Sequence, residues 1–200
     1  MRRIPGRVAL LLLLGAVLPA FADSDSLDAL MRSLAANPGG HLRFVERKFI
    51  ALLDAPVESS GTLVYRPPQR LERHTEHPQP ESMILDGDTL LLERGDRQLR
   101  LDLASHPEIG TLVDSIRHTL AGDRAALERT YELTLDGDAA LWTLRLVPRA
   151  SALLTQLRQI TVSGHHGQVR SIAILQADGD RSELTLMPPA AGPMAPERTP

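Results

Sequence analysis

Three copies of the tripeptide Asp-Gly-Asp are the first residues of this chain whose type and spacing could do chemistry. They lie at 86–88, 136–138 and 178–180. Carboxylates that alternate around a glycine are typical of the start of a calcium-binding loop, which also needs a bidentate Glu at its twelfth position. Arg97, Val147 and Pro189 occupy that position after the three copies. We therefore predict no calcium site at any of them.

The histidines are the other residues whose type suggests a site. His165 and His166 are adjacent, and His74 and His77 flank Glu76. Neighbouring residues in a turn seldom converge on one ion, and the chain has no cysteine and no HExxH motif. It also has no GxSxG elbow, no phosphate-binding loop and no dinucleotide-binding fingerprint. We expect solvated histidines, no metal, no cofactor and no enzymatic activity.

The segments on either side of the Asp-Gly-Asp copies indicate a structural role instead. Each copy separates two apolar-rich runs, such as Met83-Ile84-Leu85 before the first copy and Leu90-Leu91-Leu92 after it. Asp-Gly between two strands favours a hairpin, because type I′ turns need positive φ angles that Gly and Asp tolerate. We predict that all three copies are hairpin turns.

Apolar and polar residues alternate through most of the chain, which predicts about eleven strands. The runs lie near 42–52, 60–66, 70–76, 81–85, 89–94, 97–103, 130–136, 140–147, 157–163, 169–177 and 181–187. Such alternation leaves one face apolar and the other polar, as in antiparallel sheets. Many short strands with few helices predict a mainly β (α+β) domain built on one large curved sheet or barrel.

Four helical segments are predicted among the strands. The first covers 23–36, a short third covers 125–129, and a single turn lies near 151–154. The second has Ser105 as its expected N-cap and Gly122 at its end. Its apolar stripe comprises Ile109, Leu112, Val113, Ile116 and Leu120. Such a stripe either packs into an ordinary core or covers an apolar cavity that would suit acyl chains.

The two ends of the chain differ in composition from the rest. A basic start, an apolar run over 8–14 and the small-x-small pattern Ala20-Phe21-Ala22 predict a signal peptide over 1–22. Because the chain has no cysteine, we expect no lipoprotein anchor. We predict an exported, periplasmic domain over 23–187 and a disordered, Pro-rich tail over 188–200.

The charge balance excludes two classes of partner. Removal of the predicted signal peptide leaves 19 of the 22 basic residues against 25 acidic ones, a formal charge of −6. A nucleic-acid-binding surface needs a basic patch, and anchoring to anionic lipid needs a polybasic segment. We expect neither partner.

Several short motifs, in their order along the chain, resemble the family of the periplasmic lipoprotein carrier LolA. They are Phe44-Val45-Glu46, Gly61-Thr62-Leu63 running into Arg66-Pro67, the hairpin Asp86-Gly87-Asp88, the strand Leu144 to Pro148, and the hairpin Asp178 to Ser182. The resemblance implies an unclosed antiparallel barrel of about eleven strands, LolA/LolB-like, with helices forming a lid over an apolar cavity. It further implies a soluble carrier, expected to be a monomer, that takes acylated lipoprotein or lipid cargo from an inner-membrane donor to an outer-membrane acceptor.

The resemblance also suggests where the cargo lies. We expect the apolar cavity and its lid to include Phe44, Leu71, Met83, Leu90, Leu92, Leu101, Leu112, Ile116, Leu120, Leu133, Trp142 and Leu144. In the family, an Arg before a Pro bonds to the backbone of the lid helix and holds the empty form closed. The matching residue is Arg66, but it lies one residue closer to the Gly-x-Leu motif, which turns a strand residue to the other face. An ordinary edge-strand arginine is therefore the alternative for Arg66.

Some features depart from the family. Cavity positions that are aromatic in LolA are mostly leucine here, the C-terminal extension is replaced by a Pro-rich tail, and no basic docking surface is evident. These departures resemble LolA-related proteins encoded with aryl-polyene pigment or lipid biosynthesis genes. A non-carrier alternative stays open: a binding or assembly module in an envelope lipid or pigment biosynthetic system, with a cavity filled by its own side chains.

Overall fold

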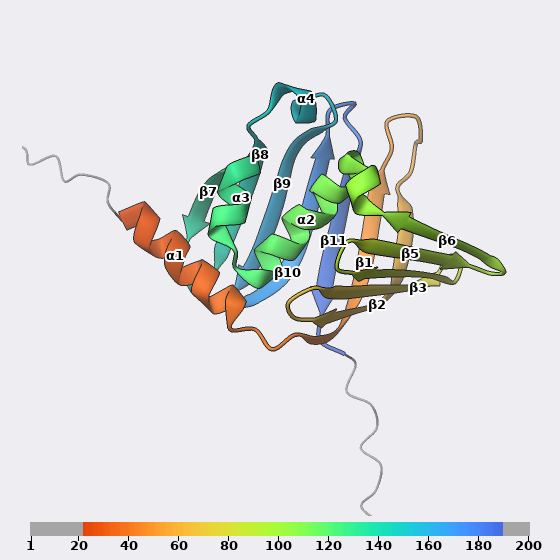
Figure 1. Cartoon of the computed structure of the whole chain (residues 1–200), viewed down its shortest axis with the longest axis horizontal. Coiled ribbons are helices and arrows are strands. Elements are labelled where there is room, and N and C mark those ends of the chain that lie inside the picture. The colour runs from red at the N-terminus through yellow and green to blue at the C-terminus, as the bar shows by residue number, and fades with distance from the viewer. Residues whose placement is uncertain (1–21, 190–200) are drawn as a thin grey trace, which may run out of the picture.

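One open sheet of eleven antiparallel strands forms the frame of the protein (Figure 1). The computed structural model describes residues 22–189. The strand order is β6-β5-β4-β3-β2-β1-β11-β10-β9-β8-β7, with β6 and β7 at the two edges. The strands are β1 (Gly40–Phe49), β2 (Val57–Arg66), β3 (Arg70–His77), β4 (Glu81–Asp86), β5 (Thr89–Arg94), β6 (Arg97–Asp102), β7 (Tyr131–Gly137), β8 (Trp142–Pro148), β9 (Leu157–His165), β10 (Gln168–Gln176) and β11 (Arg181–Met187). The predicted fold class is confirmed.

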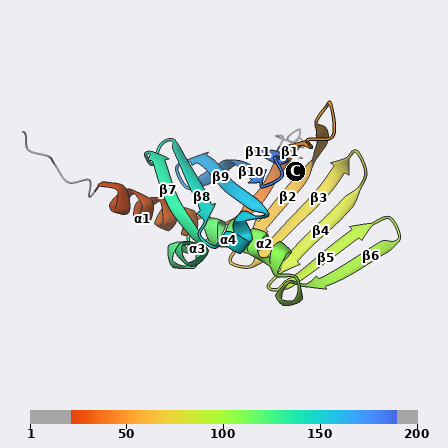
Figure 2. The same ribbon diagram turned by 90° about the horizontal axis from the view of Figure 1, so that it is seen from above.

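The sheet consists of two meanders, β1–β6 and β7–β11, joined where β1 pairs with β11. Strands β6 and β7 follow one another in the chain but lie at opposite edges, so the chain between them must cross the molecule. The crossing segment contains the 3₁₀ turn η1 (Leu103–Ser105) and the helices α2 (Pro107–Ala121) and α3 (Arg124–Thr130). It runs over the concave side of the curved sheet (Figures 1 and 2). The topology thus places a helix over the concave face.

All three Asp-Gly-Asp segments lie at hairpins, as predicted, and these join β4 to β5, β7 to β8, and β10 to β11. In the second copy, however, Asp136 and Gly137 are the last residues of β7 and pair with β8, so only Asp138 lies in the connecting loop. In the first, Asp86 pairs with Thr89, and Gly87 has a φ of 56°. Two of the carboxylates, those of Asp138 and Asp178, accept backbone N–H groups of their own turns. Asp138 Oδ1 accepts the backbone N–H groups of Leu141 and Ala140, which hold the pKa of this exposed carboxyl below its usual value.

The ends of α2 are set by two different devices. The predicted N-cap, Ser105, is wrong: the Asp102 carboxylate accepts the Ala104 N–H at 3.1 Å and starts η1, so α2 begins only at Pro107 with His106 as its N-cap. Gly122 closes α2 as predicted, with a φ of 66°. A Cβ at Gly122 would collide with the carbonyl oxygen of Met31 in α1, so glycine also lets the end of α2 approach α1 closely.

The helices α1 (Ala22–Ala35), α3 and α4 (Ser151–Leu154) match the predicted helical segments to within one residue at each end. Residues 1–21 and 190–200, which include nearly all of the predicted signal peptide and most of the predicted tail, lie outside the described residues.

Two clusters of buried side chains form the core. In the larger, Leu27, Leu30, Met31 and Leu34 of α1 pack with apolar residues of β1 and β7–β11. The smaller comprises Leu85, Leu90 and Leu103. Residues of α2 contact both: Leu112, Ile116 and Leu120 pack on the larger cluster, and Ile109 and Val113 on the smaller. The crossing helix therefore bridges the two halves of the apolar face.

Candidate functional site

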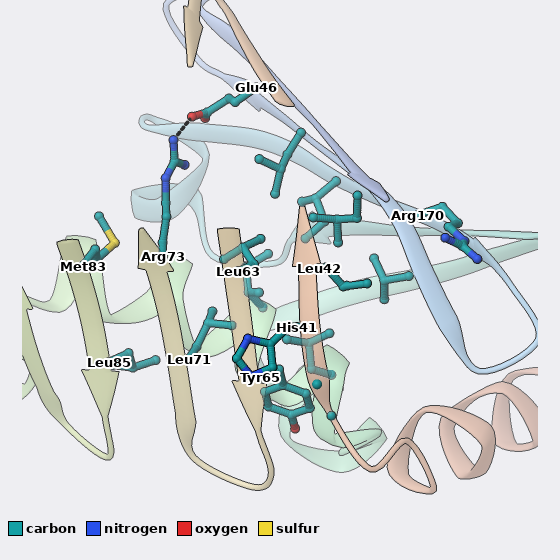
Figure 3. Close-up of a pocket in the computed structure, with 18 of the residues that line it drawn as sticks. His41, Leu42, Glu46, Leu63, Tyr65, Leu71, Arg73, Met83, Leu85 and Arg170 are labelled. Carbon is teal, nitrogen blue, oxygen red and sulfur yellow. Dashed lines mark hydrogen bonds and ion pairs between the residues drawn. The ribbon is translucent and has the colours of Figure 1, made fainter. Parts of the chain in front are cut away.

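The concave face of the sheet and α2 enclose a cavity of about 430 Å³ (Figure 3). Its walls come from β1–β5, β10, β11 and α2. From α2 the lining side chains are Leu112, Val113, Ile116 and Leu120, which recur at helical spacing. Most of the strand residues that line it are also Leu, Ile, Val or Met. The cavity is of the size and polarity of ligand-binding pockets, which span roughly 300–1,000 Å³ and are mostly apolar.

Strand register explains the apolar walls. Antiparallel pairing aligns one row of residues across β5, β4, β3, β2 and β1: Leu92, Met83, Arg73, Leu63 and Leu42. The next row on the same face, two residues along each strand, contains Leu90, Leu85, Leu71 and Tyr65. Arg73 thus carries a charge in a row whose other members are apolar.

Arg73 forms an ion pair with Glu46 in the cavity wall. Glu46 is only 5% exposed, and its Oε2 lies 2.6 Å from Arg73 Nη2. Ser59 donates to the same Oε2 at 3.2 Å, while Ser182 donates to Oε1 at 2.5 Å. Lys48 Nζ lies 3.8 Å from Oε1. Figure 3 shows Glu46 and Arg73 reaching toward one another at one end of the cavity.

These contacts keep Glu46 ionised. Burial would raise the pKa of its carboxyl, because a low-dielectric environment disfavours charge. The Ser182 hydroxyl, the Arg73 guanidinium and the Lys48 ammonium act in the opposite direction and outweigh burial, so the pKa of Glu46 lies below its usual value. The cavity therefore contains an ion pair at neutral pH.

A second polar group of the cavity is the Tyr65 hydroxyl. This oxygen is buried and has no hydrogen-bond partner in the described part of the chain. Burial raises the pKa of Tyr65, so the phenol stays neutral and can donate a hydrogen bond. Buried hydroxyls normally have partners, which makes Tyr65 a candidate contact for a bound molecule.

Arg117 fastens α2 to the sheet at the first Asp-Gly-Asp hairpin. Its Nη1 donates to Gly87 O at 3.0 Å and lies 3.6 Å from Asp88 Oδ1. Its Nη2 donates to Asp114 Oδ1 at 2.6 Å on the same helix. The side chain is only 17% exposed, so these contacts are partly shielded from water.

Of the two alternatives for Arg66, its contacts fit an ordinary strand arginine, although β2 lies inside the sheet and not at its edge. Its Nη1 lies 3.2 Å from Glu72 Oε1, and its side chain is 60% exposed. Glu72 stands between the cavity residues Leu71 and Arg73 in β3 and therefore points to the opposite face. No hydrogen bond or ion pair joins Arg66 to α2 among residues 22–189. The one-residue shift in the Arg-Pro motif turns this side chain away from the cavity, and Arg117 instead joins α2 to the first hairpin of the sheet.

The structure brings half of the predicted cavity residues together. Leu71, Met83, Leu90, Leu112, Ile116 and Leu120 line the cavity. The others do not: Phe44, Trp142 and Leu144 are fully packed in the larger core cluster, Leu133 packs against it, and Leu92 and Leu101 pack against the smaller cluster. Alternation indicates which face a side chain is on, but not which part of that face the helices fill.

Several polar lining residues were not predicted: Glu46, Arg73, Tyr65, His41 and Arg170. A signal for two of them was present. Arg73 lies two residues after Leu71, and Glu46 two residues after Phe44, so strand alternation puts both on the apolar face. A charge on that face is unusual enough to mark a site.

None of the helices within 22–189 is both long enough and apolar enough to cross a membrane.

Comparison with known proteins identifies the family of this chain. A search of curated proteins finds no match to the chain. Among solved structures, the LolA superfamily protein NE2245 from Nitrosomonas europaea is 9% identical with a TM-score of 0.45, over 84% of this chain and 95% of that one.

Two further solved structures match with lower scores. MucB in complex with MucA(peri) is 17% identical with a TM-score of 0.41, over 84% of this chain and 57% of that one. LprF from Mycobacterium bovis is 13% identical with a TM-score of 0.34, over 82% and 92%. The assignment rests on a family model described as outer membrane lipoprotein carrier protein LolA-like, which matches residues 19–199. The chain belongs to this LolA-like family.

Proposed function

We propose that this protein is a periplasmic carrier that binds the acyl chains of lipoproteins or other lipids in its cavity and delivers them toward the outer membrane. The observation that carries the proposal is the apolar cavity of about 430 Å³ between the concave sheet and α2. Membership of the LolA-like family supports a carrier role. An inner-membrane donor and an outer-membrane acceptor belong to the same proposal.

The energetics of such a carrier need no directed chemistry. Transfer of an acyl chain from water into an apolar cavity gains about 0.8 kcal/mol per CH₂ group. The Leu, Ile, Val and Met side chains of the walls supply that environment. Directional delivery then requires only an acceptor that binds the same chain more tightly, so the proposal assigns no catalytic residue.

The cavity also bears on the non-carrier alternative. A binding or assembly module without cargo would fill the space under α2 with its own side chains, because protein interiors are close-packed. A space of about 430 Å³ lined by α2 and seven strands favours a protein that accommodates a guest.

Binding of a fluorescent fatty-acyl probe to delipidated protein tests the proposal. Ile116→Asp puts a carboxylate into the cavity wall and should weaken probe binding by tenfold or more, since an unpaired charge in an apolar site is strongly unfavourable. The matched control is Val147→Asp, which adds the same charge at a residue 36% exposed on β8 that does not line the cavity. Probe binding that is absent in the unmodified protein, or equal in both variants, would contradict the proposal.

A further inference from the structure

The charges of the cavity differ in sign from those of the whole chain. The full sequence carries a formal charge of −3. The charged side chains that line the cavity are Glu46, Arg73 and Arg170, two cations and one anion. The cavity of this acidic protein therefore carries a net positive charge.

Glu46 has little capacity left for a ligand. Arg73 and Ser59 donate to its Oε2, and Ser182 donates to its Oε1 with Lys48 nearby. Three of the roughly four acceptor sites of the carboxylate are therefore occupied by internal donors. The carboxylate thus serves to hold Arg73 in place.

Arg73 does have a free donor. Its Nη2 donates to Glu46 and Ser59, and its Nε lies 3.4 Å from Thr75 Oγ1. Its Nη1 makes no hydrogen bond to any residue of the described chain. The guanidinium also lies over the Phe44 ring, with 4.4 Å from Cζ to the ring centroid, which fixes its plane. The side chain is 22% exposed, so the free donor is partly desolvated.

Stability alone does not account for this pair. Replacement of a buried ion pair by apolar residues of similar volume is often neutral or stabilising. Met83 and Leu63, the direct cross-strand neighbours of Arg73, show that apolar residues fit this row. A guanidinium positioned by a carboxylate and an aromatic ring is instead suited to bind an anionic, oxygen-rich group.

We infer that the cavity takes a lipid with an acidic head group, a carboxylate or a phosphate, which Arg73 binds while the hydrocarbon chain lies along the apolar rows under α2. This inference rests on the proposed function, because it presupposes that the cavity holds an acyl chain. Arg170 is the competing cation. It lies on the opposite side of the cavity in Figure 3, at the β-bulge of β10, and donates to His165 at 2.7 Å and Gln168 at 2.9 Å.

Head-group selectivity at constant chain length tests the inference. Hexadecanoate, hexadecyl phosphate, hexadecanol and hexadecyltrimethylammonium would compete with a bound fluorescent acyl probe at neutral pH. We expect one or both anions to bind about ten- to a hundredfold more tightly than the alcohol, the range for a hydrogen bond to a charged group. The favoured anion identifies the head group as carboxylate or phosphate.

Variants assign the selectivity to Arg73. The double variant Glu46→Gln/Arg73→Met removes both charges, so neither is left buried without a partner. It should bind hexadecanol like the unmodified protein but lose the preference for anions. If it does not fold, Arg73→Lys keeps a partner for Glu46 but lacks the second arm of the fork, and should lower the preference. The matched control is Asp136→Asn/Arg145→Met, which removes both charges of an ion pair outside the cavity and should keep the preference intact.

The outcomes separate the two proposals. Binding of none of the four amphiphiles would contradict the proposed function itself. Equal binding of alcohol and anions, tighter binding of the cation, or loss of anion preference in Arg170→Met but not in the Arg73 variants would overturn the inference and leave acyl-chain binding standing.

Discussion

At the scale of single residues, the Glu46–Arg73 pair is what distinguishes this cavity from a purely apolar one. Strand alternation puts both residues on the apolar face. The sequence could have predicted this, because Glu46 lies two residues after Phe44 and Arg73 lies two residues after Leu71. The pairing itself was not predictable, since Glu46 and Arg73 are separated by β2 in the sheet and by 27 residues in the chain. Only the register of three strands brings them together.

The lowered pKa of Glu46 predicts a specific dependence of stability on pH. Because folding lowers this pKa, the carboxylate contributes stability that is complete above the unfolded-state pKa of about 4.3 and is lost as the pH falls through the folded-state value. Glu46→Gln should therefore lower the free energy of unfolding at neutral pH, by less than the roughly 3–5 kcal/mol of a fully buried pair because Arg73 is partly exposed. The difference should shrink as the pH falls below about 4. Urea unfolding of both proteins across this range measures it, and a difference that does not change with pH would contradict the assignment.

At the scale of elements, α2 is the part of the fold on which the cavity depends. Its position follows from topology, because the chain must pass from one edge of the sheet to the other. Its apolar stripe was evident in the sequence, and four of the five stripe residues line the cavity: Leu112, Val113, Ile116 and Leu120. The hydrogen bond that attaches α2 to the sheet was not evident, because Arg117 donates to the backbone of a hairpin 30 residues earlier in the chain.

The Arg117 contact predicts how firmly α2 is held. Arg117→Met removes the bond to Gly87 O and the approach to Asp88. A net loss of about 0.5–1.5 kcal/mol should speed local opening roughly two- to tenfold. Hydrogen exchange of the α2 backbone amides, followed by mass spectrometry, measures this. Arg129→Met, at an exposed arginine of α3, is the control and should leave exchange in α2 unchanged. Equal exchange in both variants would show that Arg117 does not hold the helix.

At the scale of the whole molecule, the sequence supplied the number of strands, their hairpins and the open antiparallel sheet. It did not supply the distribution of the helices over the concave face. Trp142 and Leu144 show the alternation expected of cavity residues. They are instead buried in the core, because residues of α1 pack over that half of the sheet. The cavity lies between α2 and the strands β1–β5, β10 and β11. Periodicity specifies faces, whereas tertiary packing decides which faces meet.

Native mass spectrometry of the protein purified from the periplasm of its own cells, without detergent, tests the central claim most directly. We predict that the unmodified protein carries one lipid per chain, that organic extraction removes this lipid, and that Ile116→Asp purified in the same way lacks it. An unmodified protein that appears only at its lipid-free mass, with no extractable lipid, would contradict the account of this cavity as a carrier site.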